Sequence, residues 1–195
     1  MSLLKSRFIE LYEKEKREDV SLSEVCDVRD GTHDSPKFVT EGYPLITSKN
    51  VTSGVIDFDN VNFISKDDFD SINKRSKVDI NDIIMPMIGT IGCPVIVDKD
   101  TQFAIKNVAL IKTSKTEKLL PIYICAFLNS KYFHRQLRAL SRGCTQKFIS
   151  LGNIRSIKLK VLSDDRQKEI CTFINQIEKS KFSEDFFLNI KIFQL

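Results

Sequence analysis

Asp82-Ile-Ile-Met-Pro-Met-Ile-Gly-Thr-Ile-Gly92 is the stretch of this 195-residue chain that decides its kind of fold. The run 82–87 is short, apolar and β-like, which predicts a strand, and Gly89-Thr-Ile-Gly92 predicts a β-turn after it. The most apolar window, 83–89, contains Pro86 and is far too short to cross a bilayer. The stretch therefore predicts a strand of a folded domain and not a membrane segment.

Further β-like runs lie on both sides of this stretch. They are Tyr43–Thr47, Val61–Ile64, Pro94–Val97 and Val108–Lys112. Polar segments at 30–36 and 48–54 separate them and predict loops. Ser65, with two aspartates close behind it, is suited to cap a helix. The sequence predicts an α+β fold: a mixed, mostly antiparallel sheet with packed helices, flanked by helices at both ends of the chain.

Two helices are expected from apolar spacing and from a start signal. The first, at the N-terminus, places one apolar face at Leu4, Phe8, Leu11 and Tyr12. The second begins at Pro121, because proline suits the first position of a helix. Its expected apolar face consists of Ile122, Ala126, Phe133, Leu137 and Leu140.

The last expected helix follows Ser163-Asp-Asp165 and carries a seam of the coiled-coil type. The seam consists of Ile170, Phe173, Ile174 and Ile177. Such a short seam is marginal alone and needs a partner. We therefore expect this helix and the N-terminal helix around Phe8 to lie side by side and to form a docking surface. Residues 183–195 show no clean period and stay unassigned.

Positive charge is concentrated in one part of the chain. The formal net charge is only +4, but residues 118–163 include nine Lys or Arg and no Asp or Glu. The helix and polar loop expected there carry Lys131, Arg135, Arg138, Arg142, Thr145, Gln146 and Lys147. Clustered cations neutralise phosphates, and such polar side chains hydrogen-bond base edges. A solvated helix face and a structural turn explain the same residues about equally well.

No arrangement of residues indicates catalysis. His33 and His134 have no Cys, Asp or Glu at zinc-binding spacing, and both are interpreted as surface or loop histidines. The turn at 89–92 lacks the Gly-Lys-Ser/Thr ending of a phosphate loop, and no glycine-rich nucleotide loop follows a predicted strand. The five cysteines are odd in number and widely spaced, which predicts free thiols in a reducing cytoplasm. We therefore expect a binding protein without catalytic residues, metal or cofactor of its own.

Six segments follow one another in an informative order: Leu4-Lys-Ser-Arg-Phe-Ile-Glu-Leu-Tyr12, Val20-Ser-Leu-Ser-Glu-Val-Cys-Asp-Val-Arg-Asp-Gly-Thr32, Asp82–Gly92, Gly143-Cys-Thr-Gln-Lys-Phe-Ile149, Ile154-Arg-Ser-Ile-Lys-Leu159 and Arg166-Gln-Lys-Glu-Ile170. This ordered set resembles the target-recognition half of a type I restriction–modification specificity subunit. Together they extend over residues 4–182. The chain departs from the family in having Val161-Leu-Ser-Asp-Asp165 where a Leu-Pro-Pro-like step is usual, and one recognition domain where a full subunit has two.

The resemblance implies a division of the chain and a set of partners. Residues 1–18 correspond to an N-terminal spacer-helix remnant and linker, 19–162 to a DNA target-recognition domain, and 163–182 to the start of a spacer helix. The recognition domain is expected to bind one half of a split double-stranded DNA site. The helices are expected to dock methyltransferase subunits, which bind S-adenosylmethionine and modify adenine, with a motor–nuclease subunit as a further partner. A half-subunit, a fragment or a truncated reading frame would each fit, and self-association or pairing with a second half-subunit is expected.

Charge, loop position and resemblance together select the candidate contact residues. The expected DNA contacts are Lys49, Asn50, Thr90, Lys106, Asn107, Lys131, Arg135, Arg138, Arg142, Thr145, Gln146 and Lys147. The expected docking residues are Phe8, Ile170, Phe173, Ile174 and Ile177. A stand-alone DNA-binding regulator, a protein-interaction module and, least favoured, a methyltransferase fragment are the alternatives. Co-purification with a methyltransferase would distinguish a specificity subunit from a stand-alone regulator. Salt-dependent duplex binding would distinguish it from a protein-interaction module. A methyltransferase fragment would need an S-adenosylmethionine site.

Overall fold

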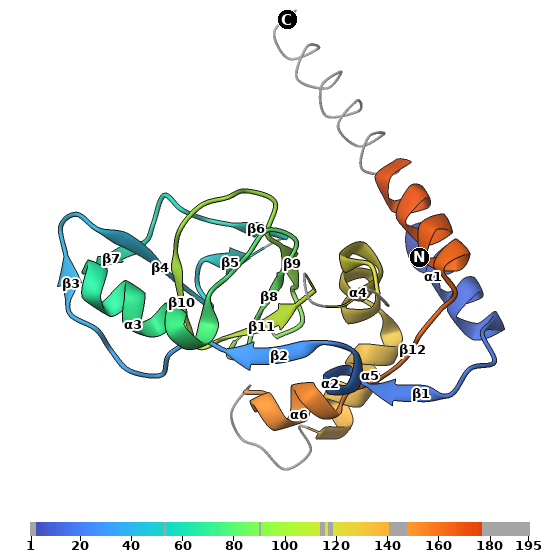
Figure 1. The fold of residues 1–195 in the computed structure, drawn as a ribbon. Coiled ribbons are helices and arrows are strands. Elements are labelled where there is room, and N and C mark those ends of the chain that lie inside the picture. Colours follow the sequence, from blue (N-terminus) through green and yellow to red (C-terminus); the bar gives the residue numbers. More distant parts are fainter. Residues whose placement is uncertain are drawn as a thin grey trace, which may run out of the picture. The chain divides into compact units, whose positions relative to one another are not determined.

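The chain forms two compact units in a computed structural model that describes residues 3–52, 54–89, 91–113, 116, 119–140 and 148–176. Unit 1 comprises residues 1–17 and 162–195, and unit 2 comprises residues 18–161 (Figure 1). Unit 2 is therefore a continuous segment of chain, whereas unit 1 combines a segment that precedes unit 2 with one that follows it.

Two four-stranded sheets form the framework of unit 2. The first has the order β2 (Asp27–Asp30), β11 (Val108–Lys112), β8 (Ile83–Pro86) and β9 (Val95–Ile96), and all its neighbouring strands are antiparallel. The second has the order β10 (Ala104–Lys106), β4 (Tyr43–Thr47), β7 (Asn62–Ile64) and β3 (Phe38–Val39), in which only β10 and β4 are parallel. Two-stranded antiparallel pairs join β1 (Asp19–Ser21) to β12 (Lys158–Lys160) and β5 (Val51–Thr52) to β6 (Val55–Ile56). The predicted α+β fold with a mostly antiparallel sheet is confirmed.

The apolar stretch 83–87 lies in the core. Every residue of β8 and of its neighbour β11 is buried. Side chains from both strands pack with Ile46, Val97 and Phe103 in one apolar cluster. A strand covered on both faces has no alternation of apolar and polar residues, which explains why 83–87 is a continuous apolar run.

Helices α2 (Leu22–Val25), α3 (Lys66–Ser76) and α6 (Leu151–Ser156) complete the sheet region. Ser65 caps α3 as predicted, because its hydroxyl accepts the N–H of Asp68 at 3.1 Å. Ser150 caps α6 in the same way, accepting the N–H of Asn153 at 3.1 Å.

The single helix predicted from Pro121 to Leu140 is wrong, because the chain breaks it into α4 (Pro121–Leu128) and α5 (Lys131–Leu140). At the break, the Ser130 hydroxyl accepts the N–H of Phe133 at 3.4 Å and so starts a new helix. The break also changes the buried face, which in α4 consists of Tyr123, Ile124, Phe127 and Leu128 instead of Ile122 and Ala126. The local hydrogen bond of Ser130 therefore decides where the helix ends, although the apolar periodicity on both sides of it predicts one continuous helix.

Unit 1 contains α1 (Leu3–Lys14) and a helix that begins at residue 164 and extends through 176, the last residue described. Glu15 and Arg166 form an ion pair of 3.2 Å between the two segments. Phe8, Leu11 and Tyr12 are buried, as the N-terminal periodicity predicts. None of the helices in the described part of the chain combines the length and apolarity needed to cross a membrane.

Candidate nucleic-acid interface

Three loops of unit 2 meet where β10 passes into β11. The loop after β2 is joined to β10 by the N–H of Thr32, which donates to the carbonyl of Ile105 at 2.9 Å. The N–H of Asn107 donates back to the carbonyl of Thr32 at 3.2 Å. The turn after β4 joins the same place, because the Ser48 hydroxyl donates to the Asn107 carbonyl at 2.9 Å. These bonds hold three polar segments, distant in sequence, on one surface.

Two residues with special backbone requirements make this junction possible. Asn107 is the only residue between β10 and β11, which belong to different sheets, and its φ of +56° lies in the left-handed region that asparagine tolerates. Gly31 passes directly over β10, where a Cβ atom would lie 2.3 Å from the carbonyl oxygen of Ile105. Glycine is therefore required at 31 by the close approach of two backbones.

His33 is held at the centre of the three loops. Its Nδ1 lies 2.8 Å from Oδ1 of Asn107, and its Nε2 lies 2.9 Å from Oδ2 of Asp30. The hydrogen bond to Asn107 raises the pKa of His33 most, and the bond to Asp30 adds to this, while the nearby Arg75 guanidinium opposes it. The imidazole remains 56% exposed, so a ligand can reach it.

Three of the predicted DNA-contact residues meet on this surface, namely Lys49, Lys106 and Asn107. Nζ of Lys106 donates to the carbonyl of Asp34 at 2.8 Å and to the hydroxyl of Ser35 at 2.6 Å, which fixes the lysine above the loop after β2. Lys49 follows Ser48 in the turn after β4 and is exposed. The structure therefore brings together residues that the sequence separates by more than fifty positions.

The structure corrects the prediction that Asn50 contacts DNA. Only 5% of it is exposed, and its amide is used inside the protein. Oδ1 accepts from the N–H of Thr47 at 3.0 Å and from its hydroxyl at 2.8 Å, while Nδ2 donates to the carbonyl of Asn60 at 2.9 Å. A buried amide with both ends bonded shapes the turn and cannot reach a base.

A hollow of about 610 Å³ adjoins the three loops. Its lining consists of Asp27, Arg29, Asp30, Lys74, Arg75, Leu151 and Arg155. Asp30 connects the hollow to His33, because it also pairs with Arg75 at 3.3 Å. Four cationic side chains against two carboxylates leave the hollow with an excess of positive charge.

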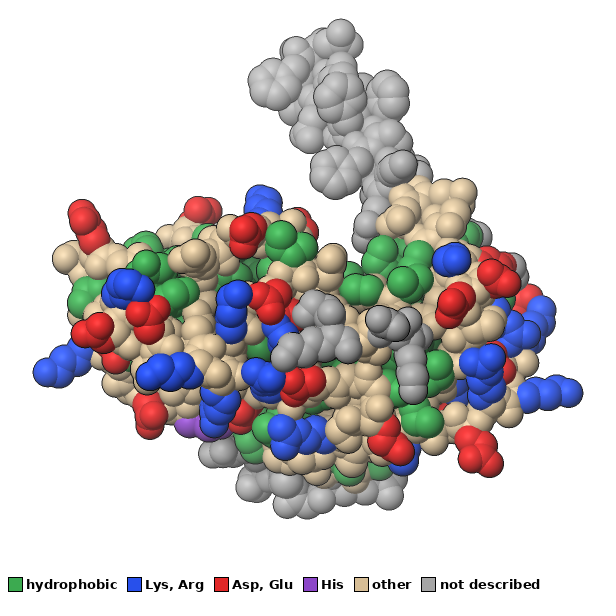
Figure 2. All heavy atoms as spheres, viewed as in Figure 1, with side chains coloured by type: hydrophobic (Ala, Val, Ile, Leu, Met, Phe, Trp, Pro, Cys, Tyr) green, Lys and Arg blue, Asp and Glu red, His purple; other side chains and the backbone are tan. Residues whose placement is uncertain are grey.

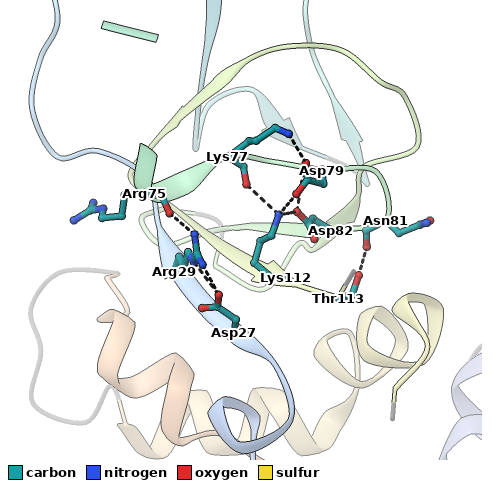
Figure 3. A network of polar contacts seen from close by, with 9 residues as sticks. All are labelled: Asp27, Arg29, Arg75, Lys77, Asp79, Asn81, Asp82, Lys112 and Thr113. Atoms are coloured by element: carbon teal, nitrogen blue, oxygen red, sulfur yellow. Dashed lines mark hydrogen bonds and ion pairs between the residues drawn. The ribbon is translucent and has the colours of Figure 1, made fainter. Parts of the chain in front are cut away.

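The arginines of the hollow are fixed by protein oxygens. Arg29 pairs with Asp27 at 2.6 Å and donates to the carbonyl of Arg75 at 2.7 Å (Figure 3), and the Asp27 hydrogen bond raises the pKa of Arg29. Arg155 donates from Nε and Nη2 to the carbonyl of Val28 at 3.0 and 2.7 Å. Such bonds brace β2 against α3 and α6 and fix the positions of the two guanidinium groups.

The face shown in Figure 2 has no uniform patch of one charge. Lys and Arg side chains alternate with Asp and Glu across the sheet region of that view. An anionic ligand would therefore be held by particular groups, such as those of the hollow and the three loops, more than by a general field.

A second group of predicted contacts lies on α5. Lys131, Arg135 and Arg138 are all exposed on this helix. Gln136 holds α5 to β12, donating to the carbonyl of Lys158 at 2.7 Å and accepting its N–H at 2.8 Å. The predicted contacts thus divide into one group on the three loops and another beside β12 (Figure 1).

The remaining predicted contacts, Thr90, Arg142, Thr145, Gln146 and Lys147, lie outside the described residues. The chain on either side of them is placed. Ile88 forms a β-bridge with Phe148, and the N–H of Ile149 donates to the carbonyl of Met87 at 2.9 Å. The segments that lead to these candidates therefore meet at the end of β8.

The predicted docking residues differ in accessibility. Phe8 is 4% exposed and Ile170 is 2% exposed, so both side chains are covered within the chain itself, and their docking role stays a prediction. Phe173 and Ile174 are only partly covered, and Ile177 lies outside the described residues. A partner surface on the last helix would therefore be centred on Phe173 and Ile174.

A buried lysine network lies behind the surface and is structural. Lys112 is 2% exposed and pairs with Asp79 at 2.6 Å and with the fully buried Asp82 (Figure 3). Its Nζ also donates to the carbonyl of Lys77 at 3.1 Å. The Lys112 ammonium lowers the pKa of Asp79. With these partners Lys112 fixes the segment before β8 to β11, and it leaves no reactive amine.

The part of the chain that the structure describes gives no indication of a metal site or of a reactive thiol. It contains no group of three or more His, Cys, Asp or Glu placed to hold a metal ion. Among the described residues, Cys26, Cys93, Cys125 and Cys171 form no disulfide, and burial raises the pKa of Cys26 to about 12. A thiol with so high a pKa is protonated at neutral pH and is a poor nucleophile.

Sequence reasoning missed His33 and the arginines of the hollow. Arg29 stands next to the buried Val28 in β2, so alternation alone would have pointed it away from the core. Nothing in sequence spacing places His33 against Asn107, 74 positions away. That contact depends on which strands become neighbours.

The fold and the surface define a class of protein: one unit is an α+β domain with a polar, cation-bearing loop surface, and the other contains α1 and the helix that begins at residue 164. The chain belongs to the family of the type I restriction modification DNA specificity domain, whose family model matches residues 14–184.

Relatives of known identity agree with this assignment. The chain is 26% identical over 139 residues to the Type I restriction enzyme EcoBI specificity subunit of Escherichia coli, covering 71% of this chain and 29% of that protein. The fold is similar to that of the HsdS subunit of Thermoanaerobacter tengcongensis, with a TM-score of 0.66, 15% identity, and coverage of 91% of this chain and 43% of that one. The S subunit of M. genitalium gives a TM-score of 0.61 at 14% identity, with 93% and 49% covered. The chain spans less than half the length of each of these relatives.

Proposed function

We propose that unit 2 binds one half of a split double-stranded DNA target as the recognition part of a type I restriction–modification specificity subunit. The observation that carries this proposal is the meeting of three polar loops, with Lys49, Lys106, His33 and Asn107, beside a cation-lined hollow. Lysines and arginines of this kind suit phosphates, and the partly exposed Asn107 and the exposed His33 suit base edges. Family membership supplies the DNA target as the ligand class.

Unit 1 is proposed to dock methyltransferase subunits and a second half-subunit or a second copy of the chain. Phe173 and Ile174, which are only partly covered on the last helix, support a helix-to-helix contact. In this assignment the chain has no catalytic residues and no cofactor. S-adenosylmethionine is bound by the methyltransferase, and a motor–nuclease subunit joins as a further partner.

The salt dependence of duplex binding tests the DNA-binding part. Fluorescence anisotropy with the full chain and a mixed-sequence duplex should give an affinity that falls steeply as salt rises. Lys49→Gln and Lys106→Gln should each weaken binding to all duplexes and reduce the salt slope by about one unit. Lys168→Gln, which changes an exposed lysine of unit 1, is the matched control and should leave both quantities unchanged. Binding without salt dependence, or equal losses in all three variants, contradicts the proposed surface.

Co-expression with the methyltransferase of the same system tests the docking part. A stable complex should form and should methylate adenine in a sequence-dependent way, while the purified chain alone should not. Duplex binding without any association with a methyltransferase would instead favour a stand-alone DNA-binding regulator.

A further inference from the structure

His33 and Asn107 form a pair whose hydrogen bonds depend on one proton. Both ring nitrogens of His33 face oxygen atoms, Oδ1 of Asn107 at 2.8 Å and Oδ2 of Asp30 at 2.9 Å. Amide and carboxylate oxygens only accept hydrogen bonds, so both ring nitrogens must donate. The arrangement therefore fits the doubly protonated imidazolium and not the neutral ring.

Loss of one proton requires a different arrangement of the same two side chains. The carboxylate of Asp30 keeps the remaining N–H on Nε2, so Nδ1 becomes an acceptor. Asn107 can satisfy that nitrogen only by turning its amide over, so that Nδ2 donates in place of Oδ1 accepting. The charge of His33 thus decides whether the end of the Asn107 amide that points away from His33 is a donor or an acceptor.

We propose, building on the DNA-binding function above, that His33 and Asn107 act as a proton-controlled base-reading pair. With His33 charged, Asn107 offers the N–H donors of Nδ2, which suit acceptors such as N7 and O6 of guanine. With His33 neutral, it offers Oδ1, which suits the amino group of adenine or cytosine. The ligand is a base edge in the major groove of the duplex.

The backbone around Asn107 restricts the change to the amide itself. Its N–H donates to Thr32 and its carbonyl accepts from Ser48, at 3.2 and 2.9 Å. Its φ of +56° is fixed by the passage from one sheet to the other. A fixed backbone with one rotatable amide gives two discrete states, which a proton can select.

The charged groups around His33 set the direction of the pH effect. Asp30 at the end of β2 favours the imidazolium, Arg75 of α3 opposes it, and Lys106 of β10 is held nearby by the carbonyl of Asp34 and the hydroxyl of Ser35. The pKa of His33 is raised in the free protein. A DNA phosphate beside the ring favours the cation further, so duplex binding takes up a proton and strengthens as pH falls through the pKa of His33.

The protonation state is measured by nuclear magnetic resonance of the full chain labelled with nitrogen-15 in histidine. The chain has only two histidines, so His33→Gln assigns both sets of ring signals. We expect both His33 ring nitrogens to be protonated at pH 6, and we expect their titration midpoint to rise when a mixed-sequence duplex is added. Asn107→Gly keeps the left-handed backbone and removes the amide, and it should lower the midpoint. Asn81→Gly, at the other described asparagine with positive φ, is the matched control and should not.

Duplex selection from a random pool at pH 6 and at pH 8 tests the base-reading step. The wild-type chain should change its preferred base at one position between the two pH values, and its affinity should change about tenfold for each unit by which DNA raises the pKa. The variants His33→Gln and Asn107→Gly should prefer the same base at both pH values, while Asn81→Gly should change its preferred base as the wild type does. A wild-type preference that is the same at both pH values, or a His33 that is neutral at pH 6, overturns the pair while leaving DNA binding intact. A wild-type chain that binds no duplex at either pH overturns the DNA-binding function itself, and the pair with it.

Discussion

Gly31→Ala is the substitution that most directly connects the fold to the surface. A Cβ at 31 would lie 2.3 Å from the carbonyl oxygen of Ile105 and 2.8 Å from the amide nitrogen of Lys106, both backbone atoms that cannot turn aside. Reaching an ordinary contact requires the two segments to separate by about 1 Å. That movement breaks the bonds from Thr32 to Ile105 and from Asn107 to Thr32.

The expected loss of stability follows from those two bonds. At about 1 kcal/mol each, with some relaxation of the surrounding segments, the free energy of unfolding should fall by about 2 kcal/mol. Because the loop after β2 carries His33, duplex affinity should fall as well, even where the protein stays folded. Urea unfolding followed by circular dichroism measures the first effect, and anisotropy under native conditions measures the second.

Gly152→Ala is the matched control for this substitution. The nearest atom to a Cβ there is the Ser150 hydroxyl at 3.8 Å, and position 152 lies in α6. Alanine should therefore be neutral or should stabilise the protein by up to about 1 kcal/mol, because it is the better helix former. If Gly31→Ala matched the wild type within about 0.5 kcal/mol and bound duplex normally, the close approach of the loop to β10 would be refuted.

Three further substitutions test the other contacts. Lys112→Met should lower the free energy of unfolding by about 3–5 kcal/mol in urea, because the buried Asp82 carboxylate would lose the ammonium that balances its charge, and adding Asp82→Leu should recover much of that loss. Asn50→Ala should cost about 1–3 kcal/mol of stability while the folded variant keeps the duplex affinity of the wild type; a selective loss of affinity would restore Asn50 as a DNA contact. Phe173→Asp should weaken self-association and methyltransferase binding in analytical ultracentrifugation without changing the stability of unit 2, whereas Thr172→Asp, on the exposed side of the same helix, should not.

The sequence predicted those elements whose signals are local. Tyr43–Thr47 and Val108–Lys112 match β4 and β11 residue for residue, and Ser65 caps α3 as its spacing to two aspartates suggests. In each case the residues that predict the element lie within a few positions of one another in the sequence. The helix from Pro121 shows the limit, because Ser130 could be read either as a polar residue on a helix or as a cap. The choice between them depends on what α4 and α5 pack against.

The surface could be predicted only in part, for a physical reason. Lys106 and Asn107 were predicted as loop residues before the β-like run 108–112, and the structure places Lys106 at the end of β10 and Asn107 between β10 and β11. His33 was missed because its two partners come from one near residue and one distant residue, Asp30 and Asn107. Asn50 was misassigned for the opposite reason, since an asparagine in a loop has the same sequence signature whether its amide faces solvent or binds its own turn.

The two asparagines show what makes a loop residue available for recognition. Asn50 lies in a turn that closes on itself, so both ends of its amide bond to nearby backbone or hydroxyl groups and the side chain is buried. Asn107 lies between two sheets, where its backbone groups are taken by Thr32 and Ser48, so its amide is not needed to hold the chain. Among the described residues, His33 bonds that amide, and we propose that this bond depends on pH. A residue whose backbone carries the structure is thereby left with a side chain that can serve binding.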